Sequence, residues 1–113
     1  EVRSTEDKKT VSGILWKRIE NNIGLQVDAT VNYITGKNDP GVSINDTQID
    51  SPYNTYTNPG LPPKPIANPG VAALQAVLNP ANTEYLYYIS DKTGHNHYAK
   101  TILEHNANIK KYL

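Results

Sequence analysis

Cysteine, methionine and phenylalanine are all absent from this chain of 113 residues. The absence of cysteine excludes a disulfide framework and a thiolate metal site, and it leaves the redox compartment open. The core must therefore be built from leucine, isoleucine, valine and alanine, with one tryptophan and eight tyrosines. Because a buried tyrosine hydroxyl needs a hydrogen-bond partner, this composition favours a partly polar interior or a wet groove.

Net charge is also absent, since eleven basic residues balance eleven acidic ones. A neutral chain has no long-range field that attracts nucleic acid, so no nucleic-acid partner is predicted. No stretch approaches the ~20 apolar residues of a membrane-spanning helix, and no signal peptide is visible. Because the chain begins at Glu1 without a methionine, we expect a single domain excised from a longer protein, so the absence of an anchor or targeting segment here does not exclude one in that protein.

The most informative segment is residues 51–70, which holds six of the eight prolines. Each proline fixes its own φ and pushes the preceding residue towards an extended conformation, which excludes helix and central strand. The segment also contains Tyr53, Tyr56, Leu61 and Ile66, with little of the charge or serine that solvates a linker. It predicts either the wall of a binding or active site or an extended strap over the core.

Capping and periodicity signals predict three or four helices. They are expected over residues 4–22, over 28 to about 33, over 69–78, and from 101 onward. Their predicted N-terminal caps are Ser4 or Thr5, Asp28, Asn68 and Thr101. Their predicted buried faces include Val11, Ile14, Leu15 and Ile19 in the first, Val71, Leu74, Val77 and Leu78 in the third, and Ile102, Ile109 and Leu113 in the last.

Residues 85–90 (YLYYIS) are the best strand candidate, because they are aromatic or β-branched and bounded by turn residues. Residues 91–94 can form a hairpin loop that returns through a partner strand at 95–100. Residues 36–50 are rich in turn formers and predict loop or a single helical turn. The predicted fold class is α+β, with three to four helices, a small antiparallel β-hairpin and a long proline-rich loop.

Two polar residues interrupt the apolar stripe of the last helix. His105 and Asn106 stand three and four residues after Ile102, where a buried face continues. Polar groups on such a face must be hydrogen-bonded or lie in a wet pocket. Two interpretations stay open: the pair is satisfied inside the core by the hairpin or the proline-rich segment, or it lines a ligand groove.

No sequence motif predicts a metal or an organic cofactor. His95 and His97 are two apart on a predicted strand and would share a face, but no neighbouring Asp, Glu or Cys offers an obvious third ligand. The alternative is a solvated face of the hairpin. Phosphate-binding, dinucleotide-binding, nucleophile-elbow and zinc-protease motifs are all missing.

Several separate blocks occur in a characteristic order along the chain. They are GLQVDATV at 24–31, SPYNTY at 51–56, GLPP at 60–63, PIANPG at 65–70, NPA at 79–81, the strand YLY at 85–87, and KT…EHN at 100–106. These blocks cover essentially the whole chain and resemble the YceG-like family of endolytic murein transglycosylases, and the proline-rich blocks are far more specific than any single short motif. The chain departs from the family pattern at Lys17, Lys64 and Asn96.

The resemblance implies a catalytic role for Glu1. Backward alignment without gaps from Lys17 places Glu1 on the glutamate that serves the family as acid/base. It would protonate the bond between N-acetylmuramic acid and N-acetylglucosamine, then deprotonate the C6 hydroxyl of the same muramyl sugar to close a 1,6-anhydro ring. No water attacks, so no second carboxylate is required, and burial should raise the pKa of the acid.

The same resemblance implies a substrate-binding set. Its members are Gln26, Asp28, Tyr53, Asn54, Thr55, Tyr56, Asn68, His105 and Asn106. We expect Glu1 to face a groove shared with Gln26, Asp28 and residues 53–56. We also expect the isolated chain to be inactive, because the α-amino group of Glu1 would lower the pKa of its side-chain carboxyl and the preceding structure is missing.

The implied partners are peptidoglycan glycan strands and cell-wall synthesis proteins. The implied location is the extracytoplasmic face of the bacterial cytoplasmic membrane, through an anchor that this chain does not include. Two other functions stay open, namely a non-catalytic peptidoglycan-binding module and a lysozyme-like muramidase. The chemical ends of the released glycans distinguish all three.

Overall fold

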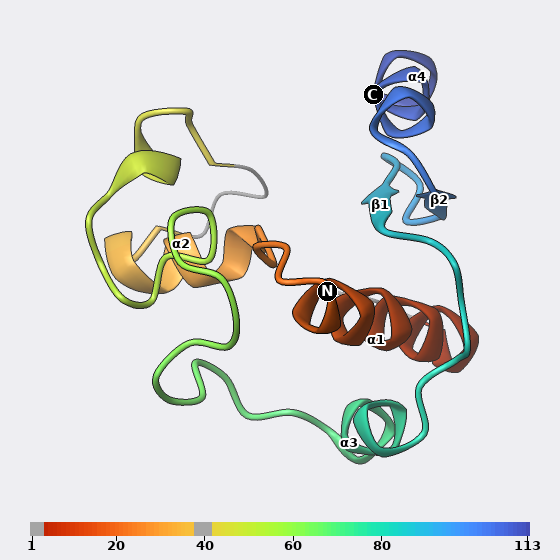
Figure 1. Cartoon of the computed structure of the whole chain (residues 1–113), viewed down its shortest axis with the longest axis horizontal. Helices are drawn as coiled ribbons and strands as arrows, with labels where there is room; N and C mark the ends of the chain where they lie inside the picture. Colours follow the sequence, from red (N-terminus) through yellow and green to blue (C-terminus); the bar gives the residue numbers. More distant parts are fainter. Residues whose placement is uncertain (1–3, 38–41) are drawn as a thin grey trace. The chain divides into compact units, whose positions relative to one another are not determined.

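The computed structural model describes residues 4–37 and 42–113, which divide into two compact units. The first unit joins the described residues up to Lys17 with Pro69–Leu113, and the second unit is Arg18–Asn68. The elements are α1 (Thr5–Glu20), α2 (Asp28–Thr35), the short 3-10 helix η1 (Asp46–Gln48), α3 (Val71–Leu78), β1 (Tyr87–Ser90), β2 (Asn96–Ala99) and α4 (Ile102–Tyr112) (Figure 1). The predicted α+β class, with four helices, one hairpin and a long proline-rich connection in these residues, is confirmed.

The start of α1 is capped as the sequence predicts. Ser4 Oγ accepts a hydrogen bond from the Asp7 backbone N–H at 3.0 Å and donates one to Asp7 Oδ2 at 2.8 Å. This exchange satisfies a backbone donor that the first helical turn would otherwise leave open. Val11 and Ile14, from the predicted stripe, are buried.

An extended segment of the first unit crosses α1 at a glycine. The Ala81 backbone N–H donates to the Lys9 carbonyl at 3.0 Å. A Cβ placed on Gly13 would lie only 2.2 Å from the Ala81 carbonyl oxygen, which no real side chain could tolerate. Gly13 is therefore required for the backbones to approach this closely.

In the first unit, α4 packs against both strands of the hairpin (Figure 1). β1 and β2 are antiparallel, with Tyr87 opposite Ala99 and Ser90 opposite Asn96. Thr101 then caps α4, where its hydroxyl accepts from the Glu104 N–H at 3.2 Å and donates to the Glu104 carboxylate. Both strands and the capping box agree with the sequence prediction, although each strand is shorter than expected.

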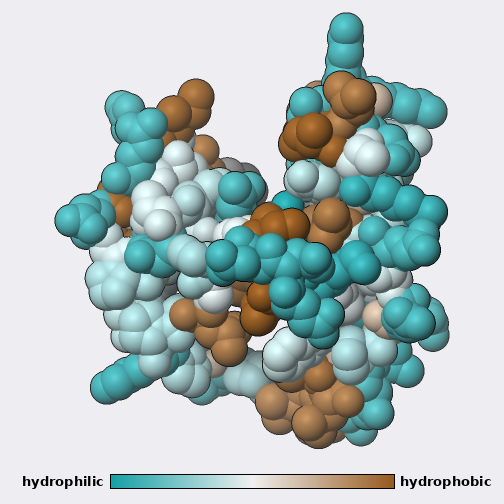
Figure 2. Space-filling model, in the orientation of Figure 1, coloured by the Kyte–Doolittle hydropathy of each residue, from teal (hydrophilic) through white to brown (hydrophobic). Residues whose placement is uncertain are grey.

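The predicted buried face of α3 is wrong. Its four large apolar residues are 50–80% exposed, whereas Ala76 is 3% exposed. They are Val71, Leu74, Val77 and Leu78. α3 thus turns its small residues inward, and Figure 2 shows brown apolar surface over this helix. The predicted N-cap of α3 at Asn68 is also wrong, because Gly70 occupies the N-cap position.

In the second unit, α2 begins one residue earlier than the sequence suggests. Val27 is the N-cap, and Asp28 is the first helical residue, so the expected cap at Asp28 is wrong. Asp28 still lies in the first turn, where the helix dipole favours a negative charge. The helix ends at Gly36, whose φ of 75° is the left-handed conformation that glycine adopts without strain.

Candidate functional site

Thr55 ties the proline-rich segment to the start of α2. Its side chain is almost completely buried, and its Oγ1 accepts a hydrogen bond from the Val27 N–H at 2.9 Å. The Thr55 and Thr30 hydroxyls lie 2.9 Å apart, and Thr30 Oγ1 donates to the Val27 carbonyl at 2.7 Å. The Thr55 carbonyl in turn accepts from the Gln26 N–H at 3.2 Å. These bonds fix residues 26–28 against residues 54–56.

Asn54 supports the same segment from the other side. It is fully buried, and its Nδ2 donates to the carbonyls of Thr47 at 3.0 Å and Ile49 at 2.8 Å. Its Oδ1 accepts from the Tyr56 N–H at 3.0 Å. Since its amide is occupied by backbone groups, the geometry gives Asn54 a supporting role, as it does Thr55, and neither presents polar atoms to a ligand.

Four other predicted residues gather around this support, and we call them the Tyr56 cluster: Gln26, Asp28, Tyr53 and Tyr56. The Tyr56 hydroxyl donates to Asp28 Oδ1, which joins the proline-rich segment to α2 through side chains. The Tyr53 ring packs on Tyr33 of α2, with ring centroids 5.1 Å apart. The second unit therefore brings together aromatic faces, a carboxylate and an exposed amide from two distant sequence blocks.

The other predicted binding residues lie elsewhere. Asn68 is exposed at the end of the second unit. His105 and Asn106 belong to α4 in the first unit. Glu1 lies outside the described residues, so its expected position beside the Tyr56 cluster stays a prediction. The structure thus assembles part of the predicted set within one unit.

His105 and Asn106 differ from the expected buried pair. His105 is half-buried, with its ring stacked on Tyr87 of β1 at 5.0 Å between centroids. Asn106 is exposed, so the prediction that it points inward is wrong. Asn108 makes the polar contact with the hairpin, donating from Nδ2 to the Tyr98 carbonyl at 3.3 Å. The face of α4 that meets the hairpin therefore passes through His105, as the stripe indicated, and Asn108, which it did not. The predicted burial of the apolar stripe itself is wrong, because its members are 37–59% exposed: Ile102, Ile109 and Leu113.

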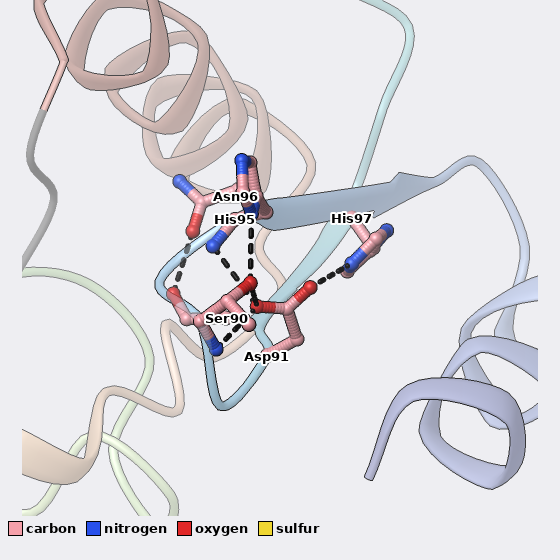
Figure 3. Close-up of polar contacts among 6 residues, drawn as sticks. Ser90, Asp91, His95, Asn96 and His97 are labelled. Atoms are coloured by element: carbon pink, nitrogen blue, oxygen red, sulfur yellow. Dashed lines mark hydrogen bonds and ion pairs between the residues drawn. The ribbon is translucent and has the colours of Figure 1, made fainter.

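The hairpin loop is organised by Asp91 (Figure 3). Its Oδ1 accepts from the Thr93 hydroxyl at 2.6 Å and from the His95 N–H at 3.0 Å, and its Oδ2 lies 2.8 Å from His97 Nε2. The Thr93 hydroxyl, followed by His97, lowers the pKa of the Asp91 carboxyl. The His97 ring also stacks on Tyr112 of α4, with centroids 3.5 Å apart. His97 thus has a structural role, because its ring contacts both the hairpin loop and α4.

A hydrogen bond that the sequence did not indicate links β2 to α1. The Tyr98 hydroxyl donates to Asp7 Oδ1 at 2.5 Å. Burial, and next this bond, raise the pKa of Tyr98 to about 12, while the Tyr98 hydroxyl lowers the pKa of Asp7. The two residues are 91 positions apart, so no local pattern could have paired them.

Neither a metal centre nor a membrane span emerges from the described part of the chain. Residues 4–37 and 42–113 contain no group of three or more His, Cys, Asp or Glu side chains arranged to hold an ion. Over the same residues, every helix is too short or too polar to cross a bilayer.

Comparison with known proteins assigns this chain to a family. The model of the YceG-like family matches residues 1–111. The endolytic murein transglycosylase of Bacillus subtilis (strain 168) is 40% identical over 113 residues, which is all of this chain and 31% of that protein. The endolytic murein transglycosylase of Streptococcus pneumoniae serotype 2 (strain D39) is 33% identical over 115 residues, covering 96% of this chain and 21% of that protein.

A solved structure gives the same result for the fold. The crystal structure of a YceG-like protein from Listeria monocytogenes matches with a TM-score of 0.89 and 38% sequence identity. It covers 94% of this chain, which corresponds to 35% of the Listeria chain. The chain thus spans about a third or less of the relatives that it matches. Because the family model extends over nearly every residue, this chain belongs to the YceG-like family.

Proposed function

We propose that this chain is part of an endolytic murein transglycosylase, a lyase that cuts peptidoglycan glycan strands between N-acetylmuramic acid and N-acetylglucosamine. The observation that carries the proposal is its 40% identity, from end to end, to a Bacillus subtilis protein of that name. The Tyr56 cluster supports it, because tyrosine faces and amide groups suit sugar rings and their N-acetyl substituents.

In this proposal Glu1 is the single acid/base. Its carboxylic acid protonates the glycosidic oxygen, and the carboxylate then accepts the proton of the muramyl C6 hydroxyl as that oxygen attacks C1. The glycosidic bond breaks first, and its electron pair leaves with the protonated N-acetylglucosamine oxygen; the C6 oxygen then bonds to C1 and closes the 1,6-anhydro ring. A hydrolase would need a second carboxylate to activate water or to act as a nucleophile.

The engagement of the described carboxylates supports a mechanism with one acid. Several of them already hold a hydroxyl, an imidazole or a lysine: Asp7 with Tyr98, Asp28 with Tyr56, Asp46 with Lys37, Glu84 with Lys100, and Asp91 with His97. Carboxylates bound in this way stabilise local structure and are poorly placed to activate water.

The substrate implies an extracytoplasmic location, because peptidoglycan lies outside the cytoplasmic membrane. Anchoring in that membrane and contact with cell-wall synthesis proteins belong to the same proposal and rest on the family resemblance alone. Localisation of the protein in its full natural length, by fractionation, would test the anchor separately from the activity.

The decisive experiment uses the protein in its full natural length and purified glycan strands. We expect strands with 1,6-anhydro-muramyl ends from the wild type and at least a hundredfold less from Glu1→Gln, since the amide cannot transfer the proton. Glu20→Gln is the matched control, because Glu20 is an exposed glutamate at the end of α1. Reducing ends would instead indicate a muramidase, and binding without cleavage would indicate a glycan-binding module.

A further inference from the structure

Gln26 has a backbone conformation that its residue type rarely adopts. Its φ is 52°, in the left-handed region, and its side chain is exposed. Such a conformation is common for glycine and tolerated by asparagine, but it is unfavourable for a residue with a long side chain. Asn22 also has a positive φ, 54°, at the end of α1, where asparagine is an ordinary helix terminator. Gln26 is thus the less expected of the two.

The strained backbone at Gln26 is imposed by its surroundings. Its N–H is bonded to the Thr55 carbonyl at 3.2 Å, and the next N–H, that of Val27, is bonded to the buried Thr55 hydroxyl at 2.9 Å. The Thr55 hydroxyl is itself held by Thr30 at 2.9 Å. These bonds involve only the backbone of Gln26, so a glycine at position 26 would keep all of them and lose the strain.

The side chain of Gln26 contributes nothing visible to the fold. Among residues 4–37 and 42–113, no partner is found for its carboxamide. Fold stability therefore favours glycine at this position, yet the chain has glutamine here, two residues before Asp28, whose carboxylate accepts the Tyr56 hydroxyl. Strained residues persist at sites where the side chain serves a ligand. A need for the carboxamide therefore explains why position 26 is glutamine and not glycine.

We propose that Gln26 determines specificity by binding the acetamido group of an N-acetylated sugar, an inference that rests on the function proposed above. A carboxamide offers one carbonyl acceptor and two N–H donors, and an acetamido group offers one N–H and one carbonyl, so two complementary hydrogen bonds can form. A sugar without its acetyl group carries an ammonium instead, which offers no acceptor to the Gln26 amide N–H. Losing that one bond should weaken binding about tenfold.

The test measures binding of the full-length protein to N-acetylated glycan strands and to the same strands after chemical N-deacetylation. We expect the wild type to prefer the acetylated strands about tenfold, and Gln26→Gly to bind acetylated and deacetylated strands equally. Asn22→Gly is the matched control, because it relieves a similar positive φ and should keep the tenfold preference. Both glycine variants should unfold at the wild-type temperature or about 1–4 °C above it.

The outcomes separate this inference from the proposed function. Retained preference in Gln26→Gly, or equal wild-type binding of the two strands, would overturn the inference whether or not the strands are cut. A clear loss of thermal stability in Gln26→Gly would also overturn it, because the side chain would then be structural. If the wild type prefers acetylated strands but releases no strands with anhydro ends, the proposed function is wrong and the role of Gln26 is still supported.

Discussion

Thr55→Val tests whether the buried threonine pair holds the Tyr56 cluster together. Valine has nearly the same shape as threonine, so the substitution removes the hydroxyl and leaves the packing almost unchanged. The Val27 N–H then loses its acceptor at 2.9 Å, while Thr30 keeps its bond to the Val27 carbonyl. One buried donor without a partner costs about 1–3 kcal/mol, so we expect a loss of about 2 kcal/mol.

Urea unfolding, followed by far-ultraviolet circular dichroism and tyrosine fluorescence, measures this loss. The midpoint should fall while the m-value stays constant, which assigns the change to stability and not to the compactness of the unfolded state. Thr57→Val is the matched control, because Thr57 is exposed two residues further along the same segment. The control should change the free energy of unfolding by less than about 0.5 kcal/mol.

Two results would refute the reasoning about Thr55. If Thr55→Val is as stable as Thr57→Val, the threonine pair is not a determinant of the fold. If the free energy falls by about 2 kcal/mol but the preference for acetylated strands is unchanged, the pair stabilises the second unit without positioning Gln26.

Two further predictions concern the first unit. Gly13→Ala should lower the free energy of unfolding by about 3 kcal/mol or more, because the new Cβ would meet the Ala81 carbonyl, whereas Gly70→Ala, with no atom within 4 Å, should be nearly neutral in the same urea titration. Tyr98 has its pKa raised to about 12, so the protonated form is favoured in the folded state, and the stability it contributes below pH 10 should be lost as pH rises towards 12. Tyr98→Phe should abolish that alkaline loss and reduce the acid loss expected as pH falls through the lowered pKa of Asp7, because Ser4 still bonds the Asp7 carboxylate, and unchanged pH profiles would contradict the assignment.

Local signals predicted the starts of α1 and α4, because capping depends on neighbours in the sequence. The bonds of Ser4 to Asp7 and of Thr101 to Glu104 both span three residues, and the capping pattern identifies both helix starts. At Asp28 the same logic failed, since its carboxylate accepts the hydroxyl of Tyr56, 28 residues away, instead of a backbone N–H of its own helix. A local rule gives way where a tertiary partner competes for the same side chain.

Periodicity predicted that α3 is a helix but not which side it buries. The apolar stripe at Val71, Leu74 and Leu78 assumes that the largest side chains face inward, yet Ala76 is the residue that is buried. Small residues allow a helix to approach its neighbour closely, and Trp16 of α1 reaches the Val77 carbonyl with its indole N–H at 3.2 Å. The pattern cannot distinguish these cases, because alanine and leucine are both apolar.

For the candidate site, the family resemblance identified which blocks matter, and the structure assigned them different physical roles. Asn54 and Thr55 look like ligand-binding residues by type, but their polar atoms are used internally. Thr30, which no local pattern singled out, completes that internal network. The sequence could not separate the supporting residues from the exposed Gln26, because both kinds are polar and stand in matching motifs.

Asp28 bears most directly on the choice between a lytic transglycosylase and a muramidase. It is the carboxylate of the Tyr56 cluster, and a hydrolase with Glu1 as its acid would need a second carboxylate near the sugar. The Tyr56 hydroxyl bonds Asp28 Oδ1, and the side chain is half-buried in the first turn of α2. A carboxylate held in this way can orient Tyr56 against a sugar ring, but its bound oxygen is not free to activate water. The bond thus gives Asp28 a part in positioning Tyr56, which the proposed mechanism, with Glu1 as its single acid/base, can use without a second catalytic carboxylate.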